Sequence, residues 1–209
     1  MIKSIIFILM LSSFGFADKI NIFAASDLKF ALDEVKREFL KLYSSGDITT
    51  KPKPYALGRI VIWSKHKNFK PELGFENLKA PWVDKIAIAN PTHAPYGEKA
   101  KQAMEKLNIY ESLKSKFVLG ENISQTAGFI SSGAADIGII ALSLALSPSI
   151  ANTPQGSYFL IDDKLHSPLI QGYGITKIGE REALAKKFYD FMQIKEAGVV
   201  MKKYGFETK

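Results

Sequence analysis

Apolar residues along the chain alternate between short runs typical of strands and repeats with helical spacing. Residues 19–24 have the pattern of a short strand, and apolar residues then recur at helical spacing through residues 28–43. Residues 59–63 and 85–89 are further strands, and the second of these leads into a helix from residue 98 to about residue 107. Strands alternating with helices predict an α/β fold with largely parallel sheets.

The second half of the chain continues this alternation. Strands are expected at residues 117–120, 136–141, 155–161 and 169–176, with a helix following the turn at residues 121–124. Two helices are expected at the end, at residues 180–193 and 195–204. The first of these carries an apolar stripe formed by Leu184, Phe188, Phe191 and Met192. In such alternating folds, ligands bind where strands end and helices begin.

The first seventeen residues have the pattern of a secretory signal peptide. Lys3 precedes an apolar run at residues 5–11 that is too short to span a bilayer, and small residues follow at Gly15 and Ala17. We expect residues 1–17 to be removed and the mature chain to begin at Asp18. A buried N-terminal helix is the weaker alternative, because no apolar face marks a packing surface.

Composition and charge narrow the class of protein. The chain has no cysteine, which argues against disulfides and a lipid anchor on cysteine, and its 46% hydrophobic content is enough for a buried core. The formal net charge is +7, and without Lys3 it is +6, with 27 basic and 21 acidic residues. The lysines are scattered along the expected helices, which indicates a solvated surface rather than a nucleic-acid interface.

Three turns between strands and helices share one chemical character. They lie at residues 25–27, 94–97 and 121–124, and each presents backbone N–H groups at the start of a helix. Together with the helix dipole, such groups favour an anion. Ser26 and Tyr96 add hydroxyl donors, and none of the three turns contains arginine or lysine. An ordinary helix cap or turn is the competing interpretation for each of them.

Other chemistries have little support in the sequence. His66, His93 and His166 are isolated and lack metal-ligand spacing, and His93 in its turn is best explained as a structural residue. There is no Gly-x-Ser-x-Gly turn and no phosphate-binding glycine loop. The carboxylates of residues 162–163 fit a solvated loop better than a catalytic pair. We therefore expect no catalytic residue and no directly bound metal.

Several short motifs, in order, resemble periplasmic molybdate-binding proteins. They are residues 22–28 (IFAASDL), 53–61 (KPYALGRIV), 88–91 and 94–97 (IANP and APYG), 138–143 (GIIALS) and 203–206 (KYGF). The resemblance implies a periplasmic-binding-protein-like α/β fold of two lobes joined by two crossing strands, at about residues 58–64 and 168–176. Residues 18–64 and 167–209 would form the first lobe, including the helix at 180–193, and residues 65–166 the second.

The resemblance also implies a ligand and its binding residues. Ser26 would donate its hydroxyl and N–H, with the amide of Asp27 beside it, while Tyr96 and the backbone of Ile123 would contribute from the second lobe. The ligand would be molybdate or tungstate, captured in the periplasm for the membrane permease of an ABC transporter. The protein would then be a monomer that binds no nucleic acid, needs no cofactor and is not an enzyme.

One departure from the family leaves alternatives open. Relatives carry a second serine-rich turn, a strand and a helix before the segment that resembles residues 53–61, whereas here a segment near residues 47–50 is missing. A non-binding remnant of the family is therefore one alternative. A serine hydrolase using Ser26 is another, although no histidine follows at a recognisable position. The related deaminases that attach their cofactor through cysteine are excluded, because the chain has none.

Overall fold

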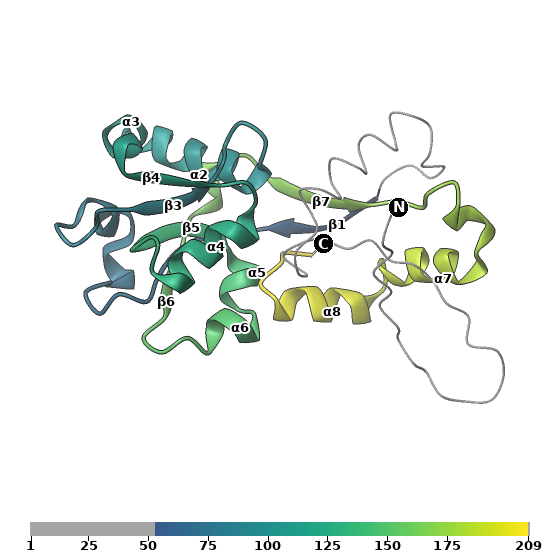
Figure 1. Cartoon of the computed structure of the whole chain (residues 1–209). Helices are drawn as coiled ribbons and strands as arrows, with labels where there is room; N and C mark the ends of the chain where they lie inside the picture. The colour runs from purple at the N-terminus through teal and green to yellow at the C-terminus, as the bar shows by residue number, and fades with distance from the viewer. Residues whose placement is uncertain (1–52, 209) are drawn as a thin grey trace, which may run out of the picture.

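The computed structural model describes residues 53–208 (Figure 1). The expected signal peptide, the strand at 19–24 and the helix at 28–43 lie outside these residues. Within the described part of the chain, no helix is long and apolar enough to cross a membrane.

A five-stranded sheet forms the centre of the larger body, in the order β4-β3-β5-β2-β6. Its strands are β2 (Ile60–Ser64), β3 (Ile86–Ala89), β4 (Phe117–Gly120), β5 (Ile137–Ala141) and β6 (Ser157–Leu160). β3 is parallel to both β4 and β5, whereas β2 is antiparallel to both β5 and β6. The sheet is therefore mixed, because the chain enters it through β2 running against its neighbours.

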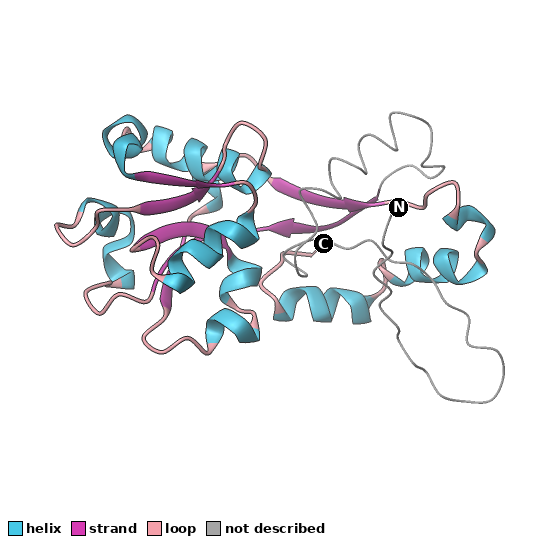
Figure 2. Cartoon of the chain, viewed as in Figure 1, coloured by secondary structure: helices cyan, strands magenta, loops and turns pink. Residues whose placement is uncertain are grey.

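The core lies around this sheet because every residue of β2, β3 and β5 is buried and all but Ser64 at the end of β2 are apolar or glycine. Two longer helices, α2 (Pro95–Lys106) and α4 (Ile123–Ser132), pack on it (Figure 2). Short helices complete this body: η2 (Pro71–Lys79), α3 (Tyr110–Leu113), η3 (Lys114–Lys116), α5 (Leu142–Ala145), α6 (Pro148–Ala151) and η4 (Asp163–Leu165). Trp63 is 1% exposed and belongs to this core.

Two antiparallel strands, β1 (Lys53–Gly58) and β7 (Leu169–Tyr173), leave this body side by side (Figure 1). The expected crossing segment at 58–64 was therefore placed too late in the chain. Only its first residue, Gly58, pairs with β7, at Leu169. The reason is visible in the burial pattern, because β1 alternates between partly exposed and buried residues whereas residues 60–64 are fully buried and belong to the five-stranded sheet.

The helix expected at residues 180–193 is shorter, with η5 (Gly179–Arg181) followed by α7 (Ala183–Phe191). Its buried side chain is Tyr189, whereas Phe191 of the expected stripe is 44% exposed. The ring of Tyr189 packs on that of Tyr173 in β7, and the Tyr173 hydroxyl donates to the Tyr189 carbonyl over 2.7 Å. Burial of this phenol raises the pKa of Tyr173. α7 is thus anchored to the crossing strands.

The last helix, α8 (Lys195–Lys203), and the residues after it pack against β1. Ala56, Met201 and Phe206 form a small buried cluster there. Leu57 and Glu207 exchange two backbone hydrogen bonds, of 2.7 and 3.0 Å, so that the C-terminal residues extend the crossing pair by one further bridge.

Candidate functional site

The candidate site is organised by one edge of the five-stranded sheet. The parallel strands β3 and β4 end together, with Ala89 paired to Gly120, and α2 and α4 begin just beyond them. β5 runs in the same direction, and its last residue, Ala141, pairs with Ile60 at the start of β2. The crossing strand β1 therefore arrives at the edge from which both helices start.

Tyr96 lies at the start of α2, directly against the crossing strand. The helix begins at Pro95, three residues before the expected residue 98, because proline has the φ of a first helical turn and needs no N–H partner there. Tyr96 is 6% exposed. A Cβ atom added to Gly58 would lie 2.7 Å from the Tyr96 hydroxyl oxygen, so only glycine leaves room for this hydroxyl.

Gly97 allows α2 to approach the end of β3 closely. A Cβ atom on Gly97 would lie 2.0 Å from the carbonyl oxygen of Ala89, which is a backbone atom and cannot rotate away. The Pro-Tyr-Gly turn thus starts the helix and also lets it pack closely against the end of β3. It fixes Tyr96 relative to the sheet edge.

Ile123 is the first residue of α4 and is 3% exposed. The preceding residue, Asn122, caps the helix by accepting a hydrogen bond from the Gln125 N–H over 2.9 Å. The Gln125 side chain in turn accepts from the Glu121 N–H over 2.6 Å. Among residues 53–208, no group accepts from the Ile123 N–H, so this donor stays available at the positive end of the helix.

The Asn122 cap gives a first testable prediction. Asn122→Ala is expected to lower the free energy of unfolding by about 1 kcal/mol, because the Gln125 N–H loses its acceptor. Asn122→Asp keeps an acceptor in place and should retain most of this stability, while adding a negative charge next to the proposed anion site. Urea denaturation measures the stabilities. An equal loss in both variants would contradict the capping role.

The structure places two of the four expected ligand residues at the same sheet edge. Tyr96 and Ile123 start helices that follow neighbouring parallel strands. Ser26 and Asp27 lie outside the described residues, so their approach to this edge stays a prediction. Among the described residues, no group of three or more histidine, cysteine, aspartate or glutamate side chains could hold a metal ion.

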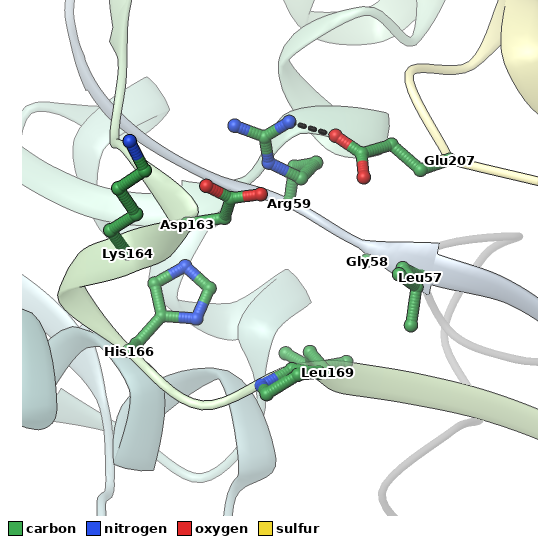
Figure 3. Close-up of a pocket in the computed structure, with 9 residues that line it drawn as sticks. Leu57, Gly58, Arg59, Asp163, Lys164, His166, Leu169 and Glu207 are labelled. Atoms are coloured by element: carbon green, nitrogen blue, oxygen red, sulfur yellow. Dashed lines mark hydrogen bonds and ion pairs between the residues drawn. The ribbon is translucent and has the colours of Figure 1, made fainter.

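A separate pocket lies beside the crossing strands and contains neither Tyr96 nor Ile123 (Figure 3). Its polar lining comes from Arg59, Asp163, Lys164, His166 and Glu207. Arg59 forms an ion pair with Glu207 and also donates to the Ile161 carbonyl over 3.3 Å, so it joins the C-terminal segment to the larger body. Arg59 was expected to be the first residue of a strand at 59–63, whereas in the structure it lies between β1 and β2.

The turn at residues 162–163 is structural, as expected. The Asp162 carboxylate accepts from the Lys164 N–H over 2.9 Å and begins η4, and this hydrogen bond lowers the pKa of Asp162. His93, which was expected to be structural, contacts the turn at residues 121–124, where its Nε2 lies 3.1 Å from the Glu121 carbonyl oxygen.

The chain is similar in sequence to two molybdate-binding proteins. A molybdate-binding protein of Rhodobacter capsulatus is 35% identical over 155 residues, which are 74% of this chain and 59% of that protein. A molybdate-binding protein of Azotobacter vinelandii is 31% identical over 192 residues, which are 92% of this chain and 75% of that protein. The chain therefore spans a little under three fifths of the first relative and three quarters of the second.

The fold of this chain also matches that of solved structures. The periplasmic molybdate-binding protein of Azotobacter vinelandii superposes with a TM-score of 0.72 and 28% identity, covering 83% of this chain and 75% of that one. The expected periplasmic-binding-protein-like α/β fold is thus confirmed. Residues 41–207 match the family described as bacterial extracellular solute-binding protein, whose members bind solutes rather than catalyse reactions. The chain belongs to the bacterial extracellular solute-binding protein family.

Proposed function

We propose that this protein captures molybdate or tungstate in the periplasm and delivers it to the membrane permease of an ABC transporter. The observation that carries the proposal is the pair of helix N-termini at Tyr96 and Ile123, which start side by side at one sheet edge. The molybdate-binding relatives in Rhodobacter and Azotobacter support the choice of ligand. Ser26 and Asp27 are proposed to close the site from the first lobe.

The chemistry of this edge suits a fully deprotonated oxyanion. The described donors are backbone N–H groups at positive helix ends and one buried tyrosine, without arginine or lysine in the two turns. A site made of donors leaves a protonated ligand with its own proton unpaired, which costs about 1–3 kcal/mol. Such a site would therefore favour a dianion such as molybdate over singly protonated phosphate.

Titration calorimetry of the mature chain with molybdate, tungstate and sulfate tests the proposal. We expect heat and one bound oxyanion per chain for molybdate or tungstate. Ser26→Ala should weaken this binding by about 1.5–3 kcal/mol, because a hydrogen bond to a charged ligand is lost. Ser149→Ala, in the short helix α6 at the surface, is a matched control that should bind like the wild type.

Absence of both heat and thermal stabilisation with excess molybdate and tungstate would overturn the receptor function. The alternative would then be a non-binding member of the family. That alternative is motivated by the segment missing near residues 47–50 and by the 59% of the Rhodobacter relative that the chain covers. Unchanged binding by Ser26→Ala would instead remove this serine from the site while leaving the receptor function in place.

A further inference from the structure

We infer that His93 is a positioning residue that fastens the two helix-start turns together, and that its protonation strengthens oxyanion binding as the pH falls. The inference rests on the proposed function and concerns the same site. His93 itself does not touch the ligand in this scheme. It acts through the turn that carries Ile123.

The contacts of His93 join segments that follow different strands. Its Nε2 lies 3.1 Å from the carbonyl oxygen of Glu121 and 3.3 Å from a carboxylate oxygen of the same residue. His93 itself belongs to the turn that leads from β3 into α2, just before Tyr96. Glu121 lies two residues before Ile123 in the turn that leads from β4 into α4. The imidazole thus spans the two turns.

The backbone next to His93 adds a second link between the same turns. The Asn90 N–H donates to the Gly120 carbonyl over 2.8 Å, and the Asn90 carbonyl accepts from the Ala94 N–H over 2.8 Å. The Asn90 side chain accepts from both the hydroxyl and the N–H of Thr92. The base of the turn is therefore fixed by the backbone, and the imidazole fixes its outer part.

The geometry accommodates the charged form of the imidazole with both nitrogens satisfied. Nε2 faces two oxygens of Glu121 that only accept, so it carries a hydrogen in either charge state. Nδ1 lies 3.3 Å from the Thr92 hydroxyl oxygen, whose own hydrogen can point to Asn90 Oδ1 over 2.8 Å. The Thr92 oxygen can then accept from a protonated Nδ1. In the neutral form, the same hydroxyl can turn and donate to Nδ1.

Protonation would change the charge beside the anion site. Among the described residues, Glu121 is the charged group within ion-pair distance of His93. With a neutral imidazole, the Glu121 carboxylate presents an uncompensated negative charge two residues before Ile123, which opposes a dianion. A protonated His93 compensates this charge. Because 28% of the His93 side chain and 73% of the Glu121 side chain are exposed, solvent keeps the effect modest.

The direction of the pH effect follows from linkage. Binding of an anion that prefers the protonated imidazole is linked to proton uptake, so its affinity rises as the pH falls. We expect molybdate to bind about threefold more tightly at pH 5.5 than at pH 8 in low salt, and the difference to shrink at high salt.

The experiment is calorimetry with molybdate at several pH values between 5.5 and 8. His93→Gln keeps an N–H that can donate to the Glu121 carbonyl but cannot gain a charge, so it should bind with an affinity close to the wild type at pH 8 and without pH dependence. His93→Ala should bind more weakly at every pH. His66→Gln is the matched control, because His66 follows β2 at the opposite sheet edge and stacks on Trp82.

Two results would overturn the inference. One is a pH dependence that persists in His93→Gln, and the other is a His93→Ala chain that binds like the wild type. A wild type that binds no oxyanion would refute the proposed function. The link that His93 forms between the two turns is then tested by amide hydrogen exchange on the ligand-free chain. His93→Ala should speed exchange at Gln125 and Thr126 in the first turn of α4. Unchanged exchange rates there would refute the link between the two turns.

Discussion

Gly97→Ala is expected to lower the free energy of unfolding by about 3 kcal/mol and to abolish measurable oxyanion binding. The added methyl group would meet the Ala89 carbonyl oxygen at 2.0 Å, so α2 must move away from the end of β3. Overpacking of this kind costs about 1–3 kcal/mol, and a backbone atom as the obstacle places Gly97 at the upper end. Because Tyr96 precedes this glycine, its hydroxyl would leave its place against Gly58.

Gly128→Ala provides the matched control for this experiment. Gly128 lies inside α4, and a Cβ atom there meets nothing within 4 Å. Alanine is the better helix former by about 1 kcal/mol, so this variant should be as stable as the wild type or slightly more stable. Urea denaturation followed by circular dichroism measures both variants. A Gly97→Ala chain with wild-type stability would contradict the close approach of α2 to the sheet.

Ile123→Pro is expected to weaken molybdate binding by tenfold or more relative to Ile123→Ala. Proline removes the N–H of the first helical residue, a position where the helix itself does not use this donor. The preceding residue, Asn122, has φ −150° and ψ 172°, an extended conformation that proline favours in its neighbour. The proline variant should therefore keep α4 while losing a hydrogen bond to a charged ligand, which contributes about 1.5–3 kcal/mol.

The alanine variant makes this comparison interpretable. Ile123 is 3% exposed, so both substitutions remove a buried side chain and should destabilise the chain by about 2–5 kcal/mol. Only the proline variant also removes the donor. Calorimetry with molybdate at a temperature where both variants are folded separates the two effects. Equal affinities would show that the Ile123 N–H does not contact the ligand.

The sequence was sufficient to predict the three parallel strands. β3, β4 and β5 were expected within a residue of their observed bounds, because a short apolar run between two turns is compatible with few structures other than a buried strand. The crossing strand β1 was misplaced for a physical reason. Its residues alternate in burial and include Pro54, and their partner is β7, far along the chain, so no local pattern identifies the pairing.

The candidate site was predictable only in part for a similar reason. The turns that contain Tyr96 and Ile123 could be placed before helices from the sequence pattern, but the choice of these two residues as ligands came from the family resemblance. The role of His93 could not be predicted, because its partner, Glu121, is 28 residues away and approaches only when β3 and β4 pair. A lone histidine in a turn is most often structural, and the sequence offers no sign of which segment it contacts.

The distance along the chain between β1 and its partners also constrains the order of folding. The sheet from β2 to β6 is built from one continuous stretch, whereas Gly58 pairs with Leu169 and Leu57 with Glu207. Bringing such distant residues together costs loop-closure entropy, which no contact offsets until the pair has formed. These pairs are therefore expected to form late. As the chain is synthesised from its N-terminus, the ribbon of β1 and β7 cannot close until Leu169–Tyr173 has been made, and the bridge from Leu57 to Glu207 can form only after that. All five strands of the larger sheet precede β7 in the chain, so we expect that sheet to form before the ribbon does.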